Sequence, residues 1–170
     1  MPVDNCRHTF RQLTQRVFPR YLADLRERIS KPIAMSEFAV PGVGPAALLR
    51  RFHLPSDFPG CYVLIEDGSP VYVGISRSVL QRLRQHVRGT THFDATLAYR
   101  MASTLFPPES TRSEAMASSD FRQRFAELRE RIRHMDVAFI EIPNPLELHL
   151  FEAYCAMELD TSRWNTFETH

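Results

Sequence analysis

Two tyrosines in apolar segments are followed by an arginine-rich stretch that also holds a histidine. The first tyrosine ends Gly60-Cys61-Tyr62, and the second begins Tyr72-Val73-Gly74. Beyond them, Arg82 and His86 are four residues apart, so a helix would present both on one face. Phenol, guanidinium and imidazole groups together offer proton acceptors, positive charge and hydrogen-bond donors. These side chains therefore indicate phosphate chemistry.

A β-hairpin is expected to carry both tyrosines. Residues 61–66 and 71–75 are rich in β-branched and aromatic side chains, and Asp67-Gly68-Ser69-Pro70 between them is typical of a turn. A regular two- or four-residue loop would put Tyr62 and Tyr72 on opposite faces of the hairpin, whereas an odd loop puts them on the same face. A shared site therefore predicts a three-residue loop or a β-bulge.

The arginine-rich stretch is expected to form a helix directly after the hairpin. Ser76 or Ser78 can cap its first turn, and Leu80, Leu83 and Val87 recur at the spacing of a buried helical face. Four arginines and no acidic residue lie between positions 77 and 88, which makes this segment locally basic. The arginines expected near another face of the helix are Arg77, Arg84 and Arg88.

Helices account for most of the remaining pattern. Residues 6–30 predict two helical pieces broken at Pro19, because proline lacks the amide that a helix interior needs. Residues 31–59 are rich in proline and glycine, and predict irregular chain with one short helix at 46–52. The elements expected after residue 90 are helices at about 93–105 and 121–132, a strand at 137–142 and a helix at about 146–159.

Composition limits the class of protein. With 170 residues, 44% of them hydrophobic, the chain can bury one core of ordinary size, so we expect one domain with elaborations. A formal net charge of +1 excludes a wholly basic nucleic-acid coat. Cys6, Cys61 and Cys155 are isolated, which disfavours both a disulfide framework and a thiolate zinc site. Because no signal peptide or membrane span is visible, we expect a soluble, cytoplasmic protein with no membrane partner.

The ordered set of motifs resembles the GIY-YIG nuclease superfamily. The matching positions are Gly60-Cys61-Tyr62 and Tyr72-Val73-Gly74 for the two signatures, Arg82 and His86 on the following helix, Glu152 for the metal-binding glutamate and Asn165 for the late asparagine. Any one of these elements would be a weak signal, but the two signatures, the Arg82 and His86 pair, Glu152 and Asn165 in the right order are specific. One departure is Ile75, which stands where several members of the family carry lysine.

The resemblance implies a fold and a domain organisation. The fold is α/β (α+β), a small three-stranded mostly antiparallel sheet flanked by helices. Residues 1–58 would form an N-terminal helical extension, in which 40–52 resembles the turn of a helix-hairpin-helix motif. Residues 59–170 would form the nuclease domain, with a helical insertion at about 88–135.

The resemblance also implies an activity, metal-dependent endonuclease cleavage of nucleic acid, with DNA favoured. Tyr62 would act as general base and Arg82 would grip the phosphate, while His86 would assist in proton transfer or hold the attacking water. Glu152 would bind Mg²⁺ (or Mn²⁺). The remaining positions are Tyr72, expected to orient groups in the catalytic site, and Asn165, Arg77 and Arg84, expected to contact nucleic acid or phosphate.

Two other classes of function stay open. A nucleic-acid-binding module could keep the same fold without turnover, although it would not need Arg82, His86 and Glu152 together. An interaction protein without nucleic-acid contact is the other, supported only by the near-neutral net charge. His149, one turn before Glu152, could be a second metal ligand, but a half-buried histidine is the favoured interpretation. The sequence predicts neither the oligomeric state nor the sequence preference.

Overall fold

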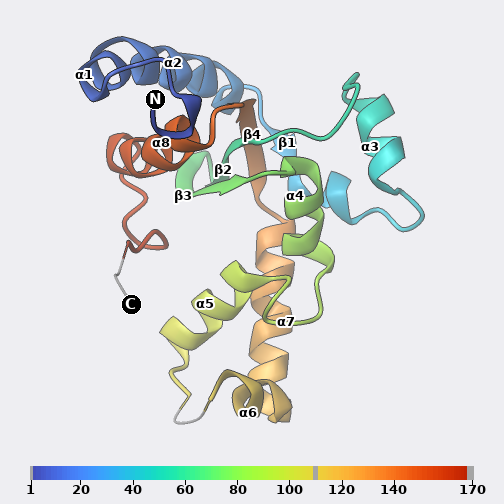
Figure 1. The fold of residues 1–170 in the computed structure, drawn as a ribbon. Helices are drawn as coiled ribbons and strands as arrows, with labels where there is room; N and C mark the ends of the chain where they lie inside the picture. The colour runs from blue at the N-terminus through green and yellow to red at the C-terminus, as the bar shows by residue number, and fades with distance from the viewer. Residues whose placement is uncertain (1, 109–110, 168–170) are drawn as a thin grey trace. The chain divides into compact units, whose positions relative to one another are not determined.

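Four strands form one sheet, in the order β1-β4-β2-β3, in the computed structural model of this chain, which describes residues 2–108 and 111–167 (Figure 1). The strands are β1 (Ile33–Ala34), β2 (Gly60–Glu66), β3 (Ser69–Ser76) and β4 (Asp136–Glu141). Both β3 and β4 pair with β2 in antiparallel register. The predicted α+β class and small antiparallel sheet are therefore confirmed, and the two-residue strand β1 adds to the three strands expected.

Helices make up most of the rest of the described chain. The α-helices are α1 (Phe10–Gln12), α2 (Phe18–Ile29), α3 (Pro45–Arg51), α4 (Val79–Arg88), α5 (Thr96–Leu105), α6 (Arg112–Ala117), α7 (Ser119–Arg133) and α8 (Pro145–Glu158). Short helical turns of other types are η1 (Val3–Asn5), η2 (Leu13–Val17) and η3 (Met35–Ala39). None of the described helices is long and apolar enough to cross a membrane.

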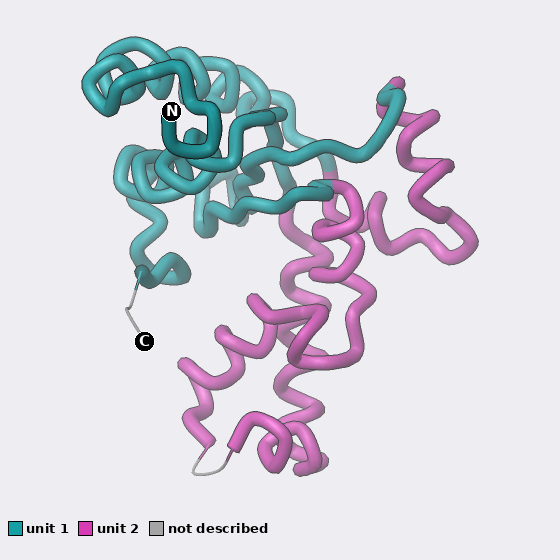
Figure 2. Tube along the Cα trace, viewed as in Figure 1, with its two compact units in different colours: residues 1–33, 54–79, 136–170 teal, residues 34–53, 80–135 magenta. Residues whose placement is uncertain are grey.

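The chain divides into two compact units (Figure 2). Residues 1–33, 54–79 and 136–170 make up the first unit, which holds the hairpin, β4, the N-terminal helices and α8. Residues 34–53 and 80–135 make up the second unit, which holds α3 and α5 to α7 together with nearly all of α4. The division of the chain at residue 58 into an extension and a nuclease domain stays a prediction.

A single-residue bulge sets the register of the hairpin. Asp67 and Gly68 form its two-residue turn with φ of 51° and 76°, as the Asp-Gly turn of a tight hairpin requires. Ile65 pairs with Pro70 but Leu64 pairs with Tyr72, so the residue between them, Val71, is left out of the ladder. The shift moves Tyr72 onto the face of Tyr62, and the predicted bulge is confirmed.

One face of the sheet forms the core of the first unit. Alternate residues of β2 point to this face, where helices α2 and α8 cover them (Figure 1). The buried side chains contributed by these three elements are Cys61, Val63, Ile65, Phe18, Leu22, Leu25, Leu148, Phe151, Cys155 and Ala156. Because side chains alternate along a strand, Tyr62 and Tyr72 belong to the opposite face.

The N-terminal segment is helical without the expected break at Pro19. Helix runs from Phe10 to Ile29, and the prediction of two pieces separated at the proline is wrong. A π turn, η2, precedes Pro19, and the amide of Phe18 donates to the carbonyl of Leu13. Pro19 therefore falls in the first turn of α2, where a missing amide costs little.

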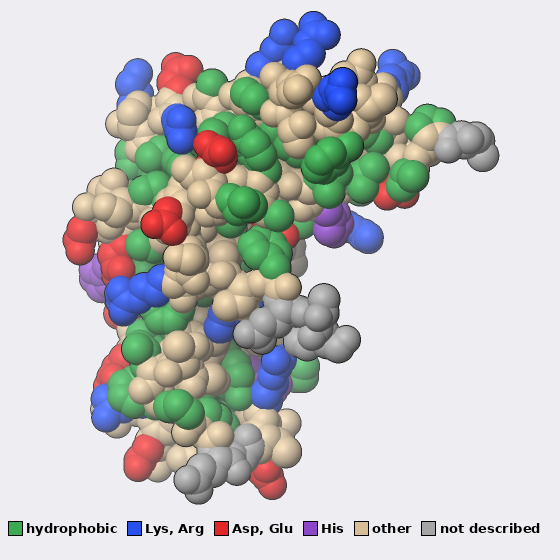
Figure 3. All heavy atoms as spheres, turned by 90° about the vertical axis from the view of Figure 1, so that its left-hand side faces the viewer, with side chains coloured by type: hydrophobic (Ala, Val, Ile, Leu, Met, Phe, Trp, Pro, Cys, Tyr) green, Lys and Arg blue, Asp and Glu red, His purple; other side chains and the backbone are tan. Residues whose placement is uncertain are grey.

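Figure 3 shows basic side chains gathered over this helical segment, at the top of the view.

The last helix begins where its sequence predicts. Asn144 is the N-cap of α8, its side chain accepts a hydrogen bond from the amide of Glu147 at 3.0 Å, and Pro145 occupies the first helical position. This cap fixes the start of the helix, and Glu152 follows Pro145, the first helical residue, by seven positions.

The second unit is mainly helical. Tyr99 of α5 and Phe121 of α7 pack with ring centroids 5.5 Å apart. The short helix α6 was not predicted, although Thr111 and Glu114 form a capping box at its start. Before α3, at the place where a helix-hairpin-helix motif has its first helix, the structure has the five-residue 3-10 turn η3.

Gly60 lets β2 and β4 approach, because a Cβ at this position would overlap the carbonyl oxygen of Ile140. We expect Gly60→Ala to lower the free energy of unfolding by about 1–3 kcal/mol, the usual cost of overpacking a buried site. Urea denaturation measures this loss. Gly44→Ala is the matched control, since a Cβ there meets nothing within 4 Å. Equal stability of the two variants would contradict the close approach.

Candidate active site

The two phenols lie side by side on one face of the hairpin. The ring centroids of Tyr62 and Tyr72 are 6.2 Å apart, with 54° between the ring planes. Tyr62 is 1% exposed, whereas Tyr72 is half-buried. The ring of Tyr62 lies over Gly74, its partner across the strands, and a Cβ at position 74 would overlap the phenol. Gly74, in the second motif, has no side chain and therefore leaves room for the ring of Tyr62, in the first motif.

Asn165 holds the outer edge of β3. Its side-chain Oδ1 accepts a hydrogen bond from the amide of Val73, and its Nδ2 donates to the Val73 carbonyl, both at 2.8 Å. β3 is the last strand in the sheet order, so this amide side chain replaces a neighbouring strand at one residue. Asn165 thus joins the segment after α8 to the strand that carries Tyr72 and Gly74.

Glu152 comes from α8, the helix on the other side of the sheet from the phenols. Its side chain is half-buried. Burial, then Cys155 and then the Glu152 carboxylate raise the pKa of the Cys61 thiol well above its ordinary value. Cys61 belongs to the face of β2 that α8 covers. The carboxylate therefore approaches the hairpin from the helical side.

In the second unit, Arg82 is fixed by groups of its own unit. One of its terminal nitrogens donates to the carbonyl of Asp94 at 2.9 Å and to Oε1 of Gln85 at 3.1 Å, and the other donates to the hydroxyl of Thr96. Such bonds hold a guanidinium in one orientation. The sequence gives no signal for the Asp94 contact, because a backbone carbonyl can belong to any residue type.

His86 is fully buried beside Arg82 on α4. Burial, and then the positive charge of Arg82, lower the pKa of His86 to about 3. The imidazole is therefore neutral at pH 7. A base with such a low pKa is a weak proton acceptor, but a neutral ring can still donate one hydrogen bond and accept another.

Two further arginines of α4 line a hollow in the second unit. Its volume is about 210 Å³, and its lining residues are Gln81, Arg84, Gln85, Arg88 and Gly89. The Nε atom of Arg84 is buried and has no hydrogen-bond partner among the described residues. Arg77, in the first unit, is exposed. The hollow combines positive charge with amide groups, a combination suited to an anionic oxygen.

The structure brings some of the predicted site residues together within each unit. In the first unit, Tyr62, Tyr72 and Asn165 meet at β3, and Glu152 approaches the neighbouring strand from α8. In the second unit, Arg82 and His86 are neighbours on α4. Sequence reasoning did not assign Gly74 its role, although a glycine within a strand signals a close approach.

No family model matches the chain, and no curated protein matches its sequence. Solved structures similar to it include point mutants of the GIY-YIG N-terminal endonuclease domain of UvrC from Thermotoga maritima, each bound to its catalytic divalent cation. The identity is 18%, the alignment covers 70% of this chain and 96% of that domain, and the TM-score is 0.36. The neighbours belong to the superfamily that the motifs resemble, but at this similarity they assign no activity to the chain.

The fit between Tyr62 and Gly74 is testable by a double-mutant cycle. We expect Gly74→Ala to cost about 1–3 kcal/mol of unfolding free energy, because the new methyl group displaces the ring. In a Tyr62→Ala background the ring is gone, and the cost of the same change should fall by at least about 1 kcal/mol. Urea denaturation of the four proteins gives the coupling, and additive costs would contradict the contact.

Buried His86 should make the protein sensitive to acid. The unfolded chain takes up a proton near pH 6.5, whereas folded His86 does so only near pH 3, so acid favours unfolding between these values. In this window we expect stability to fall by up to about 1.4 kcal/mol per pH unit through this residue. His86→Gln should flatten the pH profile of urea unfolding. His134→Gln, at an exposed position, should leave it unchanged, and identical profiles for all three proteins would refute the assignment.

Proposed function

We propose that this protein is a metal-dependent endonuclease that hydrolyses phosphodiester bonds of nucleic acid, with DNA favoured. The observation that carries the proposal is the shared face of Tyr62 and Tyr72, created by the bulge at Val71. A core role for one tyrosine would not require the second phenol beside it, nor a glycine beneath its ring. The order of the motifs also supports the proposal, because Arg82 and His86 on a basic helix, and then Glu152, follow the two tyrosines in the sequence.

The reaction centre, in this proposal, lies at the β3 edge of the first unit. Tyr72 and Gly74 are on this strand, Asn165 is bonded to it, and α8 packs against the same hairpin. Tyr62 accepts the proton of the attacking water, and Tyr72 orients the water or the phosphate by a hydrogen bond. Asn165, with both amide groups committed to Val73, is assigned to positioning β3 rather than to the phosphate.

Cationic groups of α4 are assigned to the phosphate. The fixed guanidinium of Arg82 keeps further N–H groups beyond those bonded to protein, and these stabilise charge on the phosphoryl oxygens. His86, neutral and a weak base, is assigned to holding Arg82 or the water by a hydrogen bond, not to proton transfer. Arg84, with its unpartnered Nε, and exposed Arg77 are assigned to the nucleic-acid backbone.

The metal is assigned to Glu152. A single half-buried carboxylate fits Mg²⁺, which keeps several of its waters and is often held by one or two protein carboxylates and a substrate phosphate. When bound, Mg²⁺ (or Mn²⁺) would neutralise charge on the phosphate and the leaving oxygen. His149 is not assigned to this site, because it is exposed and its Nδ1 lies 2.8 Å from the carbonyl of Pro145.

Particular observations favour a second function, a nucleic-acid-binding module without turnover. Tyr62 and His86 are buried, at 1% and 0% exposure, and the terminal nitrogens of Arg82 are bonded to protein groups. A general base must reach water, which a buried phenol does only if substrate binding opens its face. The binding module requires no such opening, so turnover distinguishes the two functions.

The deciding experiment measures cleavage and binding separately. Purified protein is incubated with plasmid, branched and single-stranded DNA, with Mg²⁺ or EDTA, beside Tyr62→Phe, Arg82→Ala and Glu152→Gln. We expect Mg²⁺-dependent cutting that each substitution lowers by about 10²–10⁴-fold, because each removes a group that acts in the reaction.

Matched controls separate chemistry from folding. Tyr154→Phe and Glu158→Gln, both on α8, make the same chemical changes as Tyr62→Phe and Glu152→Gln at positions outside the proposed site, and should retain full cleavage. Cutting that survives Arg82→Ala or Glu152→Gln would remove the proposed mechanism. Salt-sensitive DNA binding without cutting would establish the binding module, and no binding at low salt would favour an interaction protein.

A further inference from the structure

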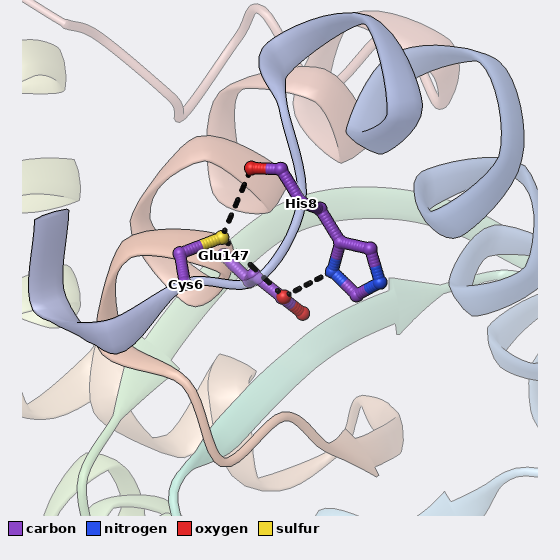
Figure 4. Close-up of side chains that lie close together, drawn as sticks. All are labelled: Cys6, His8 and Glu147. Atoms are coloured by element: carbon purple, nitrogen blue, oxygen red, sulfur yellow. Dashed lines mark hydrogen bonds and ion pairs between the residues drawn. The ribbon is translucent and has the colours of Figure 1, made fainter. Parts of the chain in front are cut away.

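A second group of metal-ligating side chains lies in the first unit, formed by Cys6, His8 and Glu147 (Figure 4). Glu147 is about 140 positions from Cys6 and His8 in sequence, yet one ligand atom from each residue lies within 4.8 Å of the others. Glu147 Oε1 is 2.8 Å from His8 Nδ1 and 3.6 Å from Cys6 Sγ. The three side chains point toward one another, as Figure 4 shows.

The separation between the Cys6 sulfur and the Glu147 oxygen matches that of zinc ligands. Zn²⁺ binds thiolate sulfur at about 2.3 Å and nitrogen or oxygen at about 2.0–2.2 Å, so tetrahedral ligand atoms lie about 3.3–3.6 Å apart. The observed sulfur–oxygen distance of 3.6 Å agrees with this value, and the 2.8 Å nitrogen–oxygen contact needs to open by about half an ångström. Rotation of an imidazole that is partly exposed can supply that change.

The surroundings resemble a prepared metal site. Glu147 is buried, and its second oxygen accepts a hydrogen bond from the phenol of Tyr21 at 2.8 Å. A hydrogen bond of this kind orients a ligating carboxylate. The backbone amide of Glu147 is in turn held by the Asn144 cap, so the residue is fixed from both ends.

Charge and access also suit a divalent cation. One thiolate and one carboxylate balance the charge of Zn²⁺, so the occupied site is electrically neutral. A hollow of about 190 Å³ adjoins His8, so water reaches the imidazole side of the cluster. Its lining residues are His8, Gln12, Arg16, Val17 and Arg20.

We propose that Cys6, His8 and Glu147 bind one Zn²⁺, which fastens the N-terminal segment to the first turn of α8. A thiolate and an imidazole select zinc over Mg²⁺ and Ca²⁺, which prefer oxygen ligands alone. On binding, Cys6 loses its thiol proton to solvent, and the neutral imidazole of His8 carries its one N–H proton on Nε2, which leaves the Nδ1 lone pair for the metal. The proposed zinc site does not include Glu152, and it does not depend on nuclease activity.

Cobalt spectroscopy tests the site directly. Metal-free full-length protein is titrated with Co²⁺ and followed by absorbance, then back-titrated with Zn²⁺. We expect one Co²⁺ per chain, a thiolate-to-cobalt charge-transfer band, visible bands of four-coordinate intensity, and complete displacement by Zn²⁺. Calorimetry in two buffers should show release of at least one proton per Zn²⁺ bound.

Variants assign the ligands. Cys6→Ser should abolish the charge-transfer band, and His8→Gln, at a 42% exposed side chain, should weaken Zn²⁺ binding at least tenfold. His53→Asn and Cys155→Ser are the controls and should bind as the parent protein does. The proposal fails if Co²⁺ does not bind, if the band survives Cys6→Ser, or if His8→Gln binds Zn²⁺ with unchanged affinity. Any of these results would leave the cluster as a hydrogen-bond network without metal.

Discussion

The contact between the Tyr62 ring and the bare backbone of Gly74 sets the geometry on which the candidate active site depends. The contact exists because β2 and β3 pair in a register that places these two residues opposite each other. Without the extra residue at Val71, Tyr62 would face Val73 and the two phenols would point to different sides of the sheet. One residue of irregular backbone therefore determines whether the two phenols share a face of the hairpin.

Much of this arrangement follows from local chemistry in the sequence. The Asp67-Gly68 turn, the Asn144 cap and the apolar stripe of α4 are each specified within a few residues, and each element forms where its signals lie. Because side chains alternate along a strand, a face shared by Tyr62 and Tyr72 requires an irregularity between them, and the sequence predicts it on that condition. The expected break at Pro19 was wrong because a π turn accommodates the proline, and periodicity alone does not distinguish a π turn from an α-helix.

Other features depend on contacts that sequence spacing does not contain. The support of Arg82 comes partly from a backbone carbonyl, and the full burial of His86 comes from packing. The cluster of Cys6, His8 and Glu147 is the clearest case. Isolated cysteines disfavour a thiolate zinc site, but folding brings Glu147 from a distant part of the chain to Cys6 and His8. Mixed ligand sets of this kind have no short-range signature.

The bond between Asn165 and Val73 has a consequence for association between chains. An edge strand offers free amide and carbonyl groups to any passing strand, and β3 is a long edge strand that carries aromatic and β-branched residues. Asn165 occupies one donor and one acceptor of that edge, at the centre of the strand. The side-chain amide of Asn165 thus blocks the pairing of another strand at Val73. Any ligand that docks by extending the sheet must first displace it.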